Sequence, residues 1–257
     1  MDANSIEVSG VTIELRTQGV GRSLLYLHGG MGPDRDSAFL DALAAEYHVV
    51  APTHPGFGGS DWPREFRTVD DLAYFYLDFA DQHEIQDGVL VGACFGGWLA
   101  SEILIRSSQR FSSAILIGTL GAKFSDHLTR DITDIHGLDT AEVDQLLFSD
   151  QDFRERDLTT LDEAALTGIA RSREAFTYFG WKPYMHNAGL ARWLHRIDIP
   201  TLLLWGAHDG FVTTKYGSQF AEAIPGAKLD TIADASHYPH VERPDETATR
   251  ILAFANC

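Results

Sequence analysis

The chain has 257 residues, of which 44% are hydrophobic and 22% charged, as in an ordinary globular protein. Its 37 acidic residues outnumber its 20 basic residues, and the formal net charge is −17. Such a charge disfavours binding to nucleic acid or to anionic membrane surfaces. A chain of this length can bury a substantial core, so we expect one large domain that acts on a small molecule.

The first ten residues lack a basic region followed by an apolar run, and no segment approaches about 20 uninterrupted apolar residues. Only two cysteines are present, Cys94 and the terminal Cys257. We expect Cys257 to be inert. Two cysteines do not indicate a disulfide framework, and a reducing compartment suits them best. These features favour a cytoplasmic protein.

Short apolar runs alternate with longer segments of helical periodicity, which predicts an α/β fold with a mostly parallel sheet between helices. A Ser9-Gly10 turn separates the first two runs, which favours an antiparallel hairpin. The predicted strands cover residues 5–8, 11–17, 23–27, 48–51, 88–91, 113–117, 201–205 and 228–232. The clearest predicted helices cover residues 37–46, 68–82, 95–106, 215–223 and 245–255.

The segment from about residue 120 to residue 197 interrupts this alternation. It is acidic and helix-rich, and it contains no convincing strand. We interpret it as an inserted helical cap, so that residues 1–119 and 198–257 form the core domain and residues 120–197 form the cap.

The most specific local pattern is Val91-Gly92-Ala93-Cys94-Phe95-Gly96-Gly97, in which a strand meets a helix through small residues. This pattern is typical of a nucleophile elbow, a tight turn that presents its central side chain above the sheet. The glycines matter because side chains there would collide with adjacent elements. Cys94 is therefore the predicted nucleophile, in preference to a buried structural cysteine.

Two backbone amides are candidates for an oxyanion hole. The Phe95 N–H begins a helix, where it has no intrahelical acceptor and lies at the positive end of the helix dipole. That dipole also favours the thiolate form of Cys94. The glycine-rich loop after Leu27 offers the second amide, with Gly30 as first choice and Met31 as second.

A thiol nucleophile needs a base, and the base needs an orienting acid. Asp209 follows the predicted strand 201–205 and His237 follows the strand 228–232, so both lie at the edge of the sheet where active sites form. His240 and His208 are alternative bases, and Asp234 is an alternative acid that precedes His237 too closely. The order along the chain is nucleophile, acid, histidine.

With these motifs in order, the chain resembles the α/β-hydrolase family over essentially its full length. The cap end, residues 181–187, and the histidine loop are similar to those of capped esterases and of carbon–carbon bond hydrolases such as meta-cleavage-product hydrolases. The elbow departs from their serine and resembles that of dienelactone hydrolases, which carry cysteine. From the cap, we expect Trp181, Tyr184, Met185 and His186 to line the substrate pocket.

The main functional prediction is hydrolysis of a small ester or lactone through a thioester intermediate on Cys94. One alternative is cleavage of a carbon–carbon bond in a conjugated diketone, with Cys94 standing where a serine is native. Another is a small-molecule receptor that has lost efficient chemistry. We predict no cofactor and no metal, because neither metal-ligand spacing nor a nucleotide-binding fingerprint occurs. The sequence does not determine the oligomeric state, and a homodimer is one candidate.

Overall fold

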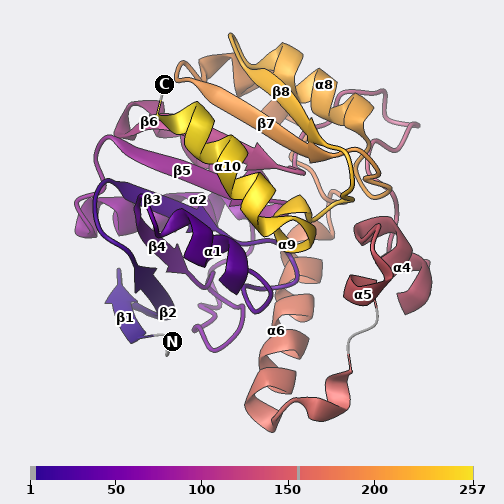
Figure 1. The fold of residues 1–257 in the computed structure, drawn as a ribbon, viewed down its shortest axis with the longest axis horizontal. Helices are drawn as coiled ribbons and strands as arrows, with labels where there is room; N and C mark the ends of the chain where they lie inside the picture. Colours follow the sequence, from indigo (N-terminus) through magenta and orange to yellow (C-terminus); the bar gives the residue numbers. More distant parts are fainter. Residues whose placement is uncertain (1–3, 155–156, 257) are drawn as a thin grey trace.

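The computed structural model describes residues 4–154 and 157–256, so Cys257 lies outside the described part. Eight strands form a single sheet in the order β1-β2-β4-β3-β5-β6-β7-β8 (Figure 1). The strands are β1 Asn4–Val8, β2 Val11–Gln18, β3 Ser23–Leu27, β4 His48–Pro52, β5 Gly88–Ala93, β6 Phe111–Ile117, β7 Thr201–Gly206 and β8 Lys228–Ile232.

The first two strands form the predicted antiparallel hairpin, in which Ile6 lies opposite Ile13. β2 also pairs antiparallel with β4, and every pair from β4 to β8 is parallel. Parallel strands are buried on both faces, which explains why β5 and β7 consist only of buried residues. The α/β fold class predicted from the sequence is confirmed.

Helices cover both faces of the sheet. α1 (Ser37–Leu43) and α10 (Pro244–Ala255) lie in front of the sheet in Figure 1 and pack on one apolar cluster. α2 (Val69–Gln82), α3 (Phe95–Ser107) and α8 (Thr214–Ala223) contribute to a larger cluster on the other face. The parallel strands therefore share a rigid core that fixes the positions of the loops at their carboxyl ends.

Residues 118–200, between β6 and β7, are called the cap segment below. Its described part contains helices and no strand of the sheet. They are α4 Thr140–Leu147, α5 Gln151–Arg154, α6 Glu163–Gly180, α7 Leu190–Trp193 and the short 3₁₀ helices Leu158–Thr160 and Leu194–Arg196. In Figure 1, α6 extends away from the sheet. That the cap is a separate domain stays a prediction.

Among the described residues, no helix combines the length and the apolar character needed to cross a membrane.

The turn between β5 and α3 brings backbone segments together so closely that only glycine fits. A Cβ atom on Gly96 would lie 2.0 Å from the Leu27 carbonyl oxygen, and one on Gly92 would lie 2.3 Å from the Gly96 carbonyl oxygen. Both contacts are with backbone, which cannot move aside as a flexible side chain can. The elbow therefore depends on these glycines for its shape.

We expect Gly96→Ala to lower the free energy of unfolding by about 3 kcal/mol or more, because β3 and α3 would have to separate. Urea unfolding followed by circular dichroism measures this change. Gly137→Ala is the matched control, since a Cβ atom there meets nothing within 4 Å. Equal stability of the two variants would contradict the close contact at Gly96.

Candidate active site

Cys94 occupies the turn between β5 and α3 in a strained backbone conformation, with φ 53° and ψ −112°. Its amide donates to the Ile117 carbonyl at 2.8 Å, and its own carbonyl accepts from the amides of Gly97 and Trp98 at 3.1 and 3.2 Å. These bonds hold the thiol at the carboxyl end of β5. The side chain is only 1% exposed, so the thiol lies in a closed site.

Asp209 and His237, predicted from separate loops, lie in direct contact. His237 Nδ1 lies 2.8 Å from Asp209 Oδ2, and both side chains are fully buried. The other carboxylate oxygen, Oδ1, accepts from the amides of Phe211 at 3.0 Å and Val212 at 2.8 Å. These three bonds fix the carboxylate, and a carboxylate on Nδ1 selects the imidazole tautomer whose Nε2 can accept a proton.

His237 Nε2 is buried and has no hydrogen-bond partner among the described residues. An unpartnered buried nitrogen is costly, and such atoms are often explained by function. The alternative base His240 faces elsewhere, with its Nε2 3.4 Å from Asp36 Oδ1. The alternative acid Asp234 is exposed.

The electrostatics of Cys94 and His237 favour a thiolate–imidazolium pair. Burial raises the pKa of the Cys94 thiol, but the charge of His237, together with the Tyr238 hydroxyl and the Gly30 amide, lowers it by more, so the net pKa is lowered. Burial lowers the pKa of His237, but Asp209 and Cys94 together raise it, and the net pKa is raised. Each charged form therefore stabilises the other.

We expect alkylation of Cys94 by iodoacetamide to persist well below the ordinary thiol pKa of about 8.5. The thiolate is lost as the pH falls through the lowered pKa of Cys94, and the imidazolium is lost as the pH rises through the raised pKa of His237. Activity should therefore fall on both sides of this window.

The pH dependence of the alkylation rate, followed by mass spectrometry, measures the first limb. Cys94→Ala subtracts the contribution of Cys257. A Cys94 alkylation profile centred on an ordinary thiol pKa would contradict the ion pair.

Two histidines, His28 and His54, hold the loop after β3, and their rings are tilted by 30° with centroids 3.7 Å apart. His28 Nδ1 donates to the Gly29 carbonyl at 2.8 Å, and its Nε2 accepts from the His54 amide at 3.0 Å. Burial lowers the pKa of His28 to about 4, so the ring stays neutral and suits this pattern. The network fixes the loop that carries Gly30 and Met31.

The Gly30 backbone amide helps to lower the pKa of the Cys94 thiol, and Phe95 begins α3 directly after Cys94. The two predicted oxyanion donors, Gly30 and Phe95, come from distant parts of the sequence, but both lie beside the nucleophile. Met31 lines the neighbouring cavity together with Gly30.

A cavity of about 270 Å³ lies between the cap segment and the core, and one of its lining residues, Tyr238, contacts Cys94. Gly30, Met31, Phe211 and Tyr238 line its core side. The cap side is mainly apolar and carries one cation and one carboxylate, with the lining residues Ile135, His136, Leu138, Thr140, Val143, Asp144, Leu147, Arg173, Phe176 and Thr177. Its size and lining suit a small, weakly polar molecule.

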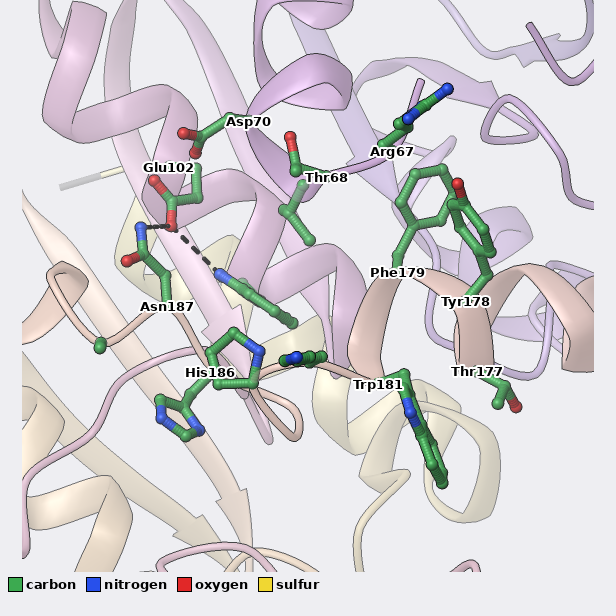
Figure 2. A pocket seen from close by; sticks show the side chains of 15 residues that line it. Arg67, Thr68, Asp70, Glu102, Thr177, Tyr178, Phe179, Trp181, His186 and Asn187 are labelled. Atoms are coloured by element: carbon green, nitrogen blue, oxygen red, sulfur yellow. Dashed lines mark hydrogen bonds between the residues drawn. The ribbon is translucent and has the colours of Figure 1, made fainter. Parts of the chain in front are cut away.

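A larger cavity, of about 620 Å³, lies elsewhere at the boundary between cap and core (Figure 2). Neither Cys94 nor His237 lines it. On one side of it, Glu102 Oε1 accepts from Trp98 Nε1 at 3.2 Å and from Asn187 Nδ2 at 2.9 Å, as the dashed lines in Figure 2 show. Gly30 and Tyr238, which adjoin the thiol, line the smaller cavity and not the larger one, so the smaller cavity is the better candidate for the substrate site.

The four cap residues predicted to line the substrate pocket are placed differently, although the rings of Trp181 and Tyr184 lie 5.4 and 5.7 Å from that of His136, which lines the smaller cavity. Trp181 and His186 line the larger cavity. Tyr184 donates to the Thr133 carbonyl at 2.8 Å, and Met185 is fully buried against Gly180. None of the four is among the residues that line the cavity beside Cys94.

Sequence reasoning did not identify Tyr238, Phe176 and Phe211 as site residues. Tyr238 donates to Cys94 Sγ at 3.4 Å, and the Phe211 ring meets His237 edge to face at 4.9 Å. The sequence feature that could have identified them is proximity in the chain, because Tyr238 directly follows His237 and Phe211 lies two residues after Asp209. Phe176 comes from α6, and only tertiary packing places it against Gly30.

Glu242 connects the histidine loop to the cap segment. Its Oε1 accepts from the Ser149 and Asp150 amides at 2.8 and 2.9 Å, and its Oε2 accepts from the Ser236 amide at 2.6 Å. Because Ser236 precedes His237, this buried carboxylate positions the histidine relative to the cap.

The family model for the alpha/beta hydrolase fold matches residues 22–244. The chain therefore belongs to this family of hydrolases, and the resemblance noted from its motifs is confirmed. A Pseudomonas fluorescens IP01 meta-cleavage product hydrolase shares the fold, with a TM-score of 0.81 and 22% identity over 99% of this chain and 98% of that one.

Two relatives are similar along most of the chain. The 2-hydroxymuconate semialdehyde hydrolase of Pseudomonas sp. strain CF600 is 25% identical, covering 97% of this chain and 92% of the relative. The dihydrolipoyllysine-residue acetyltransferase component of the acetoin cleaving system of Cupriavidus necator is 28% identical, covering 93% of this chain. The chain spans 65% of that relative's length.

Proposed function

We propose that this hydrolase cleaves a carbon–carbon bond beside a ketone in a small conjugated diketone, through a covalent intermediate on Cys94. The observation that supports the mechanism is the buried constellation of Cys94 at the strained elbow and His237 bound to Asp209 at 2.8 Å. The substrate class is supported by the relatives that are 2-hydroxymuconate semialdehyde hydrolases.

In the first half-reaction, the Cys94 thiolate adds to the ketone carbon, and the amides of Gly30 and Phe95 hold the resulting oxyanion. Collapse of this adduct breaks the bond to the neighbouring carbon. The electron pair moves into the conjugated carbonyl system of the leaving fragment, which takes a proton from the His237 imidazolium. The acyl group stays on sulfur as a thioester.

In the second half-reaction, neutral His237 removes a proton from water, and the oxygen adds to the thioester carbon. The carbon–sulfur bond breaks, the carboxylic acid leaves and the thiolate–imidazolium pair is restored. Asp209 keeps the histidine in the required tautomer in both halves.

Ester or lactone hydrolysis is the second candidate, favoured by the sulfur nucleophile itself. A thiolate attacks carbonyl carbon readily, and an activated ester gives it a better leaving group than carbon does. The same residues serve, except that a carbon–oxygen bond breaks and the leaving oxygen takes the proton from His237.

Steady-state rates on a panel of conjugated diketones, activated esters and lactones separate these candidates. Loss of the diketone chromophore without ester turnover supports carbon–carbon cleavage, and ester turnover alone supports the second candidate. Tight binding with no turnover on any member would contradict both and indicate a receptor.

The panel should be repeated with Cys94→Ser and Cys94→Ala. If the cysteine form is the fastest, sulfur is the working nucleophile. If Cys94→Ser is orders of magnitude faster on any member, that substrate defines a serine hydrolase in which the cysteine is an attenuated substitute.

A further inference from the structure

The Tyr238 hydroxyl donates a hydrogen bond to the nucleophilic sulfur, with Oη 3.4 Å from Cys94 Sγ. It is buried, and it follows His237 directly in the chain. The proposed hydrolysis does not use it, although it contacts the reacting atom. Its hydroxyl therefore needs an explanation.

The ring of Tyr238 is fixed from three sides. It stacks on Phe148 with centroids 5.7 Å apart and meets His237 edge to face at 4.7 Å. It also packs closely against the loop after β3, since a Cβ atom on Gly29 would lie 2.9 Å from its Cε1 and 3.5 Å from its hydroxyl. The hydroxyl is thus held between the sulfur and this loop.

We infer that the Tyr238 hydroxyl adapts this site to a thiol, by donating a hydrogen bond to the resting Cys94 thiolate. This inference rests on the proposed role of Cys94 as nucleophile. Charged acceptors form stronger hydrogen bonds than neutral ones, so the bond favours thiolate over thiol. A serine hydroxyl in the same place would stay neutral at rest and would gain much less.

The phenol is suited to donating a hydrogen bond while it keeps its proton. Burial and the nearby Cys94 charge raise its pKa well above the ordinary value, so it stays protonated through the cycle. When sulfur adds to a carbonyl, the negative charge moves from sulfur to oxygen. Tyr238 keeps its proton throughout, so no further reactant is required.

The test is the pKa of the Cys94 thiolate, followed by its ultraviolet absorbance and by alkylation rate in the unmodified chain and in Tyr238→Phe. Phenylalanine preserves the ring contacts and removes only the hydroxyl. A hydrogen bond to a charged group of typical strength corresponds to a rise of about one to two pH units in this pKa. No rise would overturn the inference.

Tyr47→Phe is the matched control, because it also removes a tyrosine hydroxyl, one that donates to Asn256 at 2.8 Å far from the site. It should leave the thiolate pKa unchanged. In the unmodified chain, the tyrosine absorbance should also shift as Cys94 titrates, which tests the contact even if Tyr238→Phe does not fold.

Activity in two backgrounds tests the adaptation to sulfur. Removing the Tyr238 hydroxyl should slow the cysteine form by a larger factor than it slows Cys94→Ser. Equal factors would mean a general structural role and would overturn the inference. A raised thiolate pKa in a protein that hydrolyses nothing would leave the inference standing and refute the proposed function.

Discussion

Cys94→Ala should lower kcat on the best substrate of the panel by about 10⁶-fold, the loss typical when a covalent nucleophile is removed. The sulfur carries the acyl group between the two half-reactions, and no other described nucleophile lies at the carboxyl end of β5. Steady-state turnover at saturating substrate measures the effect.

The alanine variant should keep its fold, because the strained turn is fixed by backbone hydrogen bonds and close glycine contacts and not by the thiol. Circular dichroism and the unfolding midpoint check this point. A loss smaller than about tenfold would show that catalysis proceeds without covalent attachment to Cys94.

Asp209→Asn should lower kcat by about 10⁴-fold, as in other sites where the orienting acid is neutralised. The asparagine oxygen can still accept from the Phe211 and Val212 amides, but its amide nitrogen cannot accept the proton on His237 Nδ1. The histidine would then adopt the wrong tautomer or lose its orientation.

Asp234→Asn provides the matched control, since Asp234 lies in the same loop as His237 but is exposed. It should retain near-full turnover. The reverse pattern, with Asp234→Asn inactive and Asp209→Asn active, would reassign the orienting acid.

Much of the fold could be predicted from local pattern. β3 and β8 begin and end at the predicted residues, and α3 extends one residue beyond the expected range. These elements are bounded by breakers and have clear periodicity, so short-range physics determines them. Residues 37–46 form a shorter helix than predicted, because α1 ends at Leu43 and the chain turns toward β4.

The contact between Asp209 and His237 could be anticipated because topology brings it about. Strands β7 and β8 are parallel neighbours, so the loops at their carboxyl ends meet. The elbow could be predicted equally well. Its glycines are required because they contact residues that are a few positions away in the chain or on the adjacent strand.

The lining of the cavity beside the nucleophile could not be predicted in the same way. Trp181 and His186 carry the aromatic and polar character of pocket residues, yet the path of the cap segment directs them to the larger cavity. Leu147 and Phe176, which line the smaller one, look like ordinary core positions of α4 and α6. Which face of a cap helix meets the core is decided by tertiary packing that local sequence does not encode.

The central claim is that an acyl group is attached to Cys94 during turnover. Rapid quenching in acid with an activated ester or a conjugated diketone, followed by peptide mass spectrometry, tests it most directly. We predict a thioester adduct on the peptide containing Cys94 that forms and decays within the turnover time. Turnover without any adduct on that peptide, or with the acyl group on another residue, would contradict the account.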